Sequence, residues 1–244
     1  MAIKFTEKNR YKARRRNAGT LGGVQEKMAS SIIHYAMSKR ISEKIEVYDL
    51  ERFLFGASVV PDFSSHEDGS YDQAHFQGWS VDCLRKGIDW RLFEQQYRNV
   101  FDMDSIYLGY WCHLVQDSMW FHDIVDKYVR IYPRDIRQNY YQKGYHDYMR
   151  LNYLLSKEYS LEVSSFSQLS IPINEVRGDV MQTRLNAFYE QFNAVECSKD
   201  DLELYKWDMI INYIESCAEF CIREIDAMQN DRTRIEPSMF FVTS

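Results

Sequence analysis

His113 and Asp117 lie one helical turn apart and combine an imidazole with a carboxylate in an otherwise apolar segment. At roughly 100° per residue, the two side chains share one face of a helix. The rest of that face consists of Ile106, Gly109, Tyr110, Trp120 and Ile124. Burying an ionised carboxylate is costly unless a cation or several hydrogen-bond donors compensate it. The pair therefore indicates either a cation-binding site or a plain His–Asp hydrogen bond in the core.

A second group of candidates lies in the segment PDFSSHEDGSYDQAHF, which begins at Pro61. Pro61 fixes the direction in which the chain enters Asp62, and His75 follows near the end of the segment. Two of the six histidines of the chain, His66 and His75, fall here. The alternative interpretation is an acidic, solvated loop that contains a stray histidine.

A third candidate is His34 in MASSIIHYAMSKR. Its helical neighbours on the same face are Ser30, Ser31 and Ser38, whose small side chains leave room around the ring. Taken alone, the pattern also fits an exposed histidine on a polar face.

Helical periodicity dominates the chain from residue 24 onward. The segments with this pattern are 24–41, 46–56, 79–100 with a break near Gly87, 104–131, 134–157, 174–195 and 199–229. Two long stretches, 57–78 and 158–172, resist a helical interpretation, and loops of that length are often functional. The second stretch is rich in serine and is a candidate lid. We expect a basic flexible leader over 1–23, one helical domain over 24–230 and a C-terminal tail over 231–244.

The net charge of −6 is the sum of two unlike parts. Residues 1–16 hold seven basic residues and one acidic residue, a charge of +6, so the rest of the chain carries −12. An acidic domain is a poor partner for the nucleic-acid backbone, although the basic leader could compensate. The charge therefore favours a small-molecule partner over nucleic acid.

The five cysteines form an odd number with no CxxC pair, which favours free thiols in a reducing compartment. Cys217 and Cys221 lie one turn apart and are interpreted as core thiols, since no second pair completes a soft-metal site. The sequence shows neither a secretory signal nor an apolar run of about 18 residues. We therefore expect a cytoplasmic protein without a transmembrane segment.

Five motifs occur in an order that resembles the zinc-dependent phospholipase C and single-strand nuclease superfamily, in particular its shorter bacterial members. The matching residues are His34, GASVVPD ending at Asp62, His75-Phe76, Gly109-Tyr110 with His113-Leu114 and Asp117, and DYMRLN from Asp147 to Asn152. The resemblance covers roughly residues 28–157.

The resemblance implies an all-α fold, a single multi-helix domain around a buried metal site. It implies that Asp62, His75, His113 and Asp117 bind one zinc ion, and that Asp117 bridges to a second ion that His34 also binds. Neutral imidazoles and carboxylates suit zinc, although Mn or Fe would also be compatible. Two ions roughly 3.5–4 Å apart would activate a water and clamp a phosphodiester. Asp62 could in addition orient or deprotonate that water.

Some residues depart from the family pattern. Secreted relatives use their mature N-terminus as a ligand, whereas His34 lies well inside this chain. For a third zinc the only histidine candidates are His122 and His146, and His122 points away from Asp117 on a straight helix. Asp147 shares a face with apolar residues and is the carboxylate we expect to be buried, as a further ligand or a support for one. We therefore expect two ions and assign no third.

The resulting hypothesis is a zinc-dependent hydrolase of phosphate esters, a phospholipase C-like phosphodiesterase that uses a metal-activated water. Its substrate would be a small-molecule or lipid-headgroup phosphodiester, and His66 would contact it at the entrance of the site. One alternative is a single-strand nuclease of the same superfamily. The other is a non-enzymatic helical protein that holds a metal for structural reasons, which a closed coordination sphere would indicate.

Overall fold

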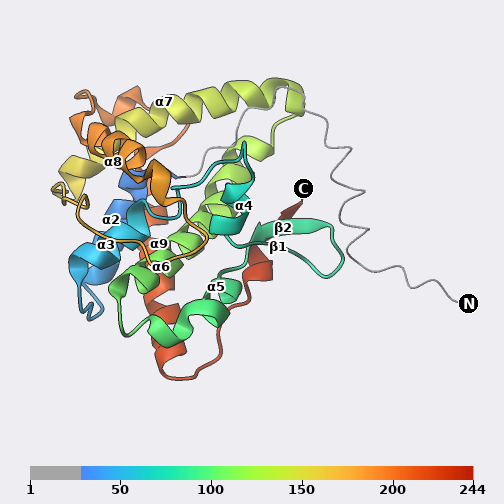
Figure 1. Ribbon diagram of the computed structural model, residues 1–244. Coiled ribbons are helices and arrows are strands. Elements are labelled where there is room, and N and C mark those ends of the chain that lie inside the picture. Colours follow the sequence, from blue (N-terminus) through green and yellow to red (C-terminus); the bar gives the residue numbers. More distant parts are fainter. Residues whose placement is uncertain (1–28, 244) are drawn as a thin grey trace, which may run out of the picture.

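The computed structural model describes residues 29–243, and most of them are helical (Figure 1). The part of the chain that is described contains eight α-helices. They are α2 (Ser31–Ser42), α3 (Leu50–Ser58), α4 (Ser70–Ala74), α5 (Trp90–Tyr97), α6 (Ser105–Trp120), α7 (Arg134–Glu158), α8 (Met181–Glu190) and α9 (Trp207–Gln229). The predicted helical class is confirmed. The expected leader over 1–23 lies outside the described residues.

Short helical segments extend or join the α-helices. They are η1 (Arg98–Val100), η2 (Phe121–Arg130), η3 (Gly178–Val180), η4 (Gln191–Asn193), η5 (Lys199–Asp201) and η6 (Pro237–Phe240). The π-helical segment η2 continues α6 without a break, so the helix predicted over 104–131 is present. The last helix begins later than expected, because Ser198 and Asp201 form a capping box around the single turn η5 instead of opening α9.

A small antiparallel sheet replaces the first half of the helix predicted over 79–100. Its strands β1 (Gln77–Trp79), β2 (Arg85–Ile88) and β3 (Val242–Thr243) lie in the order β1-β2-β3. The prediction was wrong here because Asp82 accepts hydrogen bonds from the Ser80 hydroxyl and the Leu84 amide, which closes a hairpin turn. The expected tail over 231–244 supplies β3, which pairs with β2.

Helix α6 lies beside α9 in the middle of the molecule, with α2 and α3 close by and α7 across one end (Figure 1). Every residue of α6 except Leu108 is buried. A helix buried on all sides must place its polar groups against partners inside the protein. His113 and Asp117 of α6 are such groups.

Helices α3 and α6 run in the same direction in close contact. The Asp49 amide donates to the Ser105 hydroxyl at 3.0 Å, and the Ala57 carbonyl oxygen lies 3.0 Å from Nδ1 of His113. Between these two contacts, Gly109 lies against the backbone of Phe53. The three contacts are four residues apart on each helix, so they fix the register of α3 against α6.

The start of each of these helices is specified locally. Asp49 caps α3 by accepting from the Arg52 amide, and Asp104 caps α6 by accepting from the Ile106 amide. The Arg52 side chain also donates to Asp104 at 2.6 Å, which ties the two N-termini together. Among the residues described, no helix has both the length and the apolar character needed to cross a membrane.

Candidate metal centre

His113 is held by the neighbouring helix. Its ring is fully buried, and its Nδ1 atom donates to the carbonyl oxygen of Ala57 on α3 at 3.0 Å. A carbonyl oxygen can only accept, so the proton lies on Nδ1 and the lone pair on Nε2. That Nε2 atom lies 3.4 Å from Oδ2 of Asp117, one turn further along α6.

His75 is oriented in the same way from a different segment. It follows α4, and its Nδ1 atom donates to the carbonyl oxygen of Tyr71 at 3.2 Å. Its Nε2 atom lies 3.4 Å from Oδ2 of Asp117 and 3.6 Å from Oδ1 of Asp62. His75 therefore presents a second ring nitrogen to the two carboxylates.

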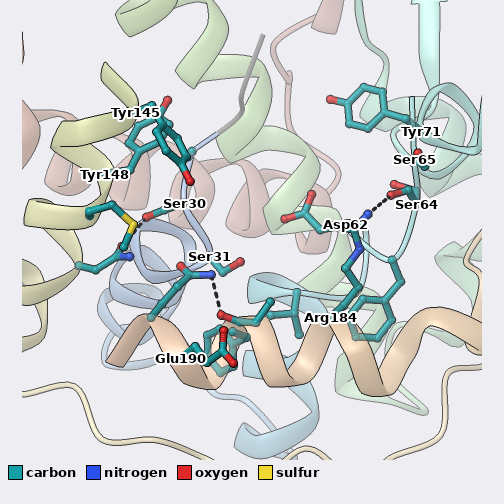
Figure 2. A pocket seen from close by; sticks show the side chains of 18 of the residues that line it. Ser30, Ser31, Asp62, Ser64, Ser65, Tyr71, Tyr145, Tyr148, Arg184 and Glu190 are labelled. Carbon is teal, nitrogen blue, oxygen red and sulfur yellow. Dashed lines mark hydrogen bonds between the residues drawn. The ribbon is translucent and has the colours of Figure 1, made fainter. Parts of the chain in front are cut away.

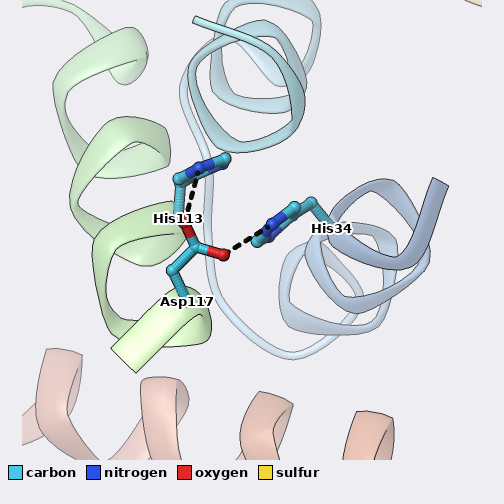
Figure 3. Close-up of side chains that lie close together, drawn as sticks. All are labelled: His34, His113 and Asp117. Atoms are coloured by element: carbon cyan, nitrogen blue, oxygen red, sulfur yellow. Dashed lines mark ion pairs between the residues drawn. The ribbon is translucent and has the colours of Figure 1, made fainter. Parts of the chain in front are cut away.

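His34 reaches the same carboxylate from α2 (Figure 3). Its Nδ1 atom donates to Oε1 of Gln116 at 2.8 Å, and the amide nitrogen of Gln116 donates to the Ser38 hydroxyl. Its Nε2 atom lies 3.2 Å from Oδ1 of Asp117, and its ring stacks on that of His113 with centroids 4.0 Å apart. The two oxygens of Asp117 thus face different histidines.

Asp62 is the most exposed of the five expected metal ligands, with 23% of its side chain accessible. The three histidines and Asp117 are fully buried. Its Oδ1 atom lies 3.9 Å from Nε2 of His113. The turn that carries it is rigid, since the Asp62 amide donates to the carbonyl of Val59 and the Ser64 hydroxyl to the carbonyl of Pro61.

Six buried nitrogen and oxygen atoms of this cluster, all able to bind a metal ion, have no hydrogen-bond partner among the described residues. They are Nε2 of His34, His75 and His113, Oδ1 of Asp62, and both carboxylate oxygens of Asp117. Leaving six polar atoms unpaired in a core is expensive, and a shared cation removes that cost. A tetrahedral zinc site with bonds of about 2.0–2.1 Å separates its ligand atoms by roughly 3.3 Å. The distances of 3.2–3.9 Å in this cluster have that scale.

The donor atoms form two groups, His34–His113–Asp117 and Asp62–His75–His113, and each group can hold a metal ion. The two groups share His113, whose Nε2 atom can bind only one ion at a time. Oδ2 of Asp117 faces His75 and His113, while Oδ1 faces His34. The five residues expected as ligands are therefore brought together.

The electrostatics of the metal-free cluster favour a cation. Burial would raise the pKa of Asp117, but the facing rings of His113 and His34 hold it well below its usual range. Burial also lowers the pKa of His75, yet the carboxylates of Asp117 and Asp62 raise it to about 9. The pKa of His34 is raised by Asp117 against the effect of burial, whereas burial and the nearby His34 lower the pKa of His113. Asp117 thus stays ionised inside the core.

The candidates for a third ion lie elsewhere. Asp147 is buried as expected, but its oxygens accept the backbone amides of residues 203–205 at 2.7–2.9 Å, so it supports a chain turn instead of a metal. His122 has 41% of its side chain exposed and pairs with Asp123. His146 is 58% exposed and pairs with Glu203. The structure brings none of the three to the metal centre.

A pocket of about 570 Å³ opens beside Asp62 (Figure 2). The side chain of His66 lines it, as expected for a residue at the entrance, and stacks on Tyr71, which stacks in turn on His75. This row of rings leads from the pocket to the metal ligands. Sequence reasoning missed Arg184 of α8 in the pocket wall, because no local pattern relates it to Asp62.

Sequence reasoning also missed Gln116. A usable signal existed, since this amide lies three residues after His113 within an apolar helix. The side-chain oxygen of a buried amide can accept the ring N–H of a neighbouring histidine ligand.

Comparisons with known proteins add no relative: no protein-family model, curated protein or solved structure matches this chain. The functional interpretation therefore depends on the geometry of the cluster and the pocket, together with the motif resemblance.

Proposed function

We propose that the protein is a zinc-dependent hydrolase of phosphate esters, a phosphodiesterase of the phospholipase C type. The observation that carries the proposal is the convergence of six unpartnered buried donor atoms beside a pocket. The motif order gives the same assignment of ligands. The substrate class is a small-molecule or lipid-headgroup phosphodiester.

The chemistry of the donor set supports zinc. Three imidazole nitrogens and carboxylate oxygens, with no thiolate in the cluster, are typical of hydrolytic zinc sites. Bound divalent ions supply Lewis acidity toward a phosphoryl oxygen and lower the pKa of water. Mn or Fe would suit the same donors, so the native ion is a matter for metal analysis.

Asp62 has two tasks in this proposal. Its buried Oδ1 atom faces His75 and His113, while the exposed part of its side chain lines the pocket. It is the one carboxylate of the cluster that a substrate and its attacking water can reach. We assign it to orient that water and to accept its proton, a role that suits a positioned carboxylate.

The buried histidines hold their positions without access to solvent. The Nδ1 atom of each ring donates to a fixed acceptor. The acceptors are the carbonyl oxygen of Ala57 for His113, the carbonyl oxygen of Tyr71 for His75 and the side-chain oxygen of Gln116 for His34. Fixed acceptors prevent the rings from turning and keep the Nε2 atoms directed at the carboxylates. The chain thus preorganises the cluster before any ion binds.

The two alternatives are less well supported. A nuclease needs several cations along a phosphate backbone, whereas Arg184 is the one lysine or arginine among the described residues of the pocket wall. A purely structural metal needs a closed coordination sphere, whereas Asp62 connects the cluster to a pocket.

Metal analysis and turnover of the purified chain test the proposal. We expect at least one zinc-class ion per chain and hydrolysis of bis(p-nitrophenyl) phosphate. Asp62→Asn should retain the fold and lose at least about 100-fold in kcat, in line with removal of a general base. Asp72→Asn is the matched control, because Asp72 is an exposed acid of the same segment that pairs with Lys86.

The proposal fails if less than one ion per chain binds and His113→Ala changes neither metal content nor stability. Metal binding without hydrolysis of any phosphate ester would instead support the structural alternative. Faster turnover of single-stranded DNA than of small diesters would support the nuclease.

A further inference from the structure

Arg184 projects from α8 into the pocket on the side of Asp62 (Figure 2). The helix is anchored by its neighbour Leu185 and by Phe188, both of which are buried in the core. The guanidinium donates through Nη2 to the carbonyl oxygen of Ser64 at 2.8 Å. Arg184 is therefore fixed against the same turn that carries Asp62, two residues before Ser64.

Within residues 29–243, no carboxylate forms an ion pair with Arg184, and its hydrogen-bond partner is the neutral carbonyl of Ser64. Arg177, close by in the sequence, shows the contrast, because its guanidinium pairs with Asp68 and Asp179. A guanidinium has five N–H donors, so most of those of Arg184 remain for a ligand.

The wall around Arg184 limits what that ligand can be. Glu190 lies in the same wall, and so do the aromatic rings of Tyr71, Tyr145 and Phe188. A single cation suits one phosphate group, and the carboxylate disfavours a second anionic group by repulsion. The volume of about 570 Å³ suits a small organic molecule and not a polymer.

We propose that Arg184 binds the phosphoryl group of the substrate from its position beside Asp62, and that the substrate is a small organophosphate with a single phosphate. This inference rests on the proposed function, since it names the substrate class of the same site. Arginine suits the task because its planar fork bonds two phosphate oxygens at once. The aromatic wall then contacts the organic group that the phosphate carries.

Calorimetric titration of the metal-loaded full chain with inorganic phosphate tests the inference. Arg184→Gln should weaken phosphate binding by about 10- to 100-fold, the range for loss of a charged hydrogen-bonded pair. Arg184→Lys should keep part of the affinity, because the charge remains and the fork is lost. Metal content and melting temperature should stay at wild-type values in both variants.

Arg98→Gln is the control, because Arg98 lies outside the pocket wall and only approaches Asp102 at 3.8 Å on the surface. It should bind phosphate within about twofold of wild type, as surface charges contribute little. An equal loss of phosphate affinity in Arg98→Gln and Arg184→Gln would overturn the inference, because the net charge of the protein and not the position of the arginine would then set the affinity.

The two proposals fail separately. If phosphate binding depends on Arg184 but no ester is hydrolysed, the inference stands and the proposed function fails. If esters are hydrolysed while Arg184→Gln binds phosphate as tightly as wild type, the inference fails and the proposed function stands. Wild-type protein that binds no phosphate at millimolar concentration would also overturn the inference.

Discussion

Gly56 of α3 and Gly109 of α6 each lie directly against the backbone of the other's helix. A Cβ atom on Gly109 would lie well inside 3.0 Å of the Phe53 carbonyl oxygen, and one on Gly56 well inside 3.0 Å of the Ile106 carbonyl oxygen. No side chain fits between helices that approach so closely. This contact sets the spacing at which His113 reaches the Ala57 carbonyl.

Gly109→Ala should therefore destabilise the protein and disturb the metal centre. Overpacking against a rigid backbone typically costs 1–3 kcal/mol, and the better helix propensity of alanine offsets up to about 1 kcal/mol. We expect a net loss of about 1–2 kcal/mol in urea unfolding of the metal-free protein, with weaker metal binding. Gly178→Ala is the control, because nothing lies within 4 Å of a Cβ at Gly178, and it should change stability by less than about 0.5 kcal/mol. Equal unfolding midpoints for the two variants would refute this account.

Asp117→Asn should reduce the number of bound ions. The substitution preserves shape but removes the charge that faces His34 through Oδ1 and His75 and His113 through Oδ2. An amide offers one oxygen where the carboxylate offers two, so it cannot bridge two ions. Metal analysis after dialysis should give at most one ion per chain, compared with two in the wild type. Two retained ions would show that Asp117 does not bridge.

Asp147→Asn should lower stability and leave the metal content unchanged. Asp147 accepts three backbone amides from residues 203–205, and an asparagine would turn an N–H group toward one of them. We expect a loss of about 2–4 kcal/mol in the free energy of unfolding, because charged, buried hydrogen bonds are lost. Loss of metal in a folded Asp147→Asn protein would instead place this carboxylate in the centre.

Stabilisation by zinc should increase between pH 6.5 and 8.5. In the metal-free protein the pKa of His75 is about 9, compared with an ordinary value of 6.5, and the pKa of His34 is raised as well. A raised pKa stabilises the folded state fully below pH 6.5, and this contribution is lost as pH rises toward 9. Zinc needs the neutral rings, so its binding strengthens over the same range. Beginning at pH 6.5 avoids the region where protonation of His113, whose pKa is lowered, would matter.

The measurement is the difference in melting temperature between zinc-loaded and chelator-treated protein at pH 6.5, 7.5 and 8.5. The difference should widen with pH in the wild type and widen less in His75→Gln. A difference in melting temperature that stays constant across this pH range would contradict competition between zinc and protons for the ring of His75.

Part of this fold could be predicted because its determinants are local. The period of apolar residues marks α6 and α7, and the same period places His113 and Asp117 on one face. The turn 80–84 was misjudged because Asp82 overrides the apparent helical pattern through two short-range hydrogen bonds. Asp147 was correctly expected to be buried. Its hydrogen bonds to backbone amides could not be predicted, since those amides lie more than 50 residues away in the chain.

The sequence by itself determined the helical class, the start of the helix near Asp104, and the residue types able to hold a metal. Each of these depends on neighbours within a few positions, where backbone geometry alone relates the side chains. Only the tertiary structure decided that His34, Asp62 and His75 meet Asp117, and that Arg184 lines the adjoining pocket. Those meetings depend on how α2, α3, α6 and α8 pack, and packing is set by contacts between residues far apart in the chain.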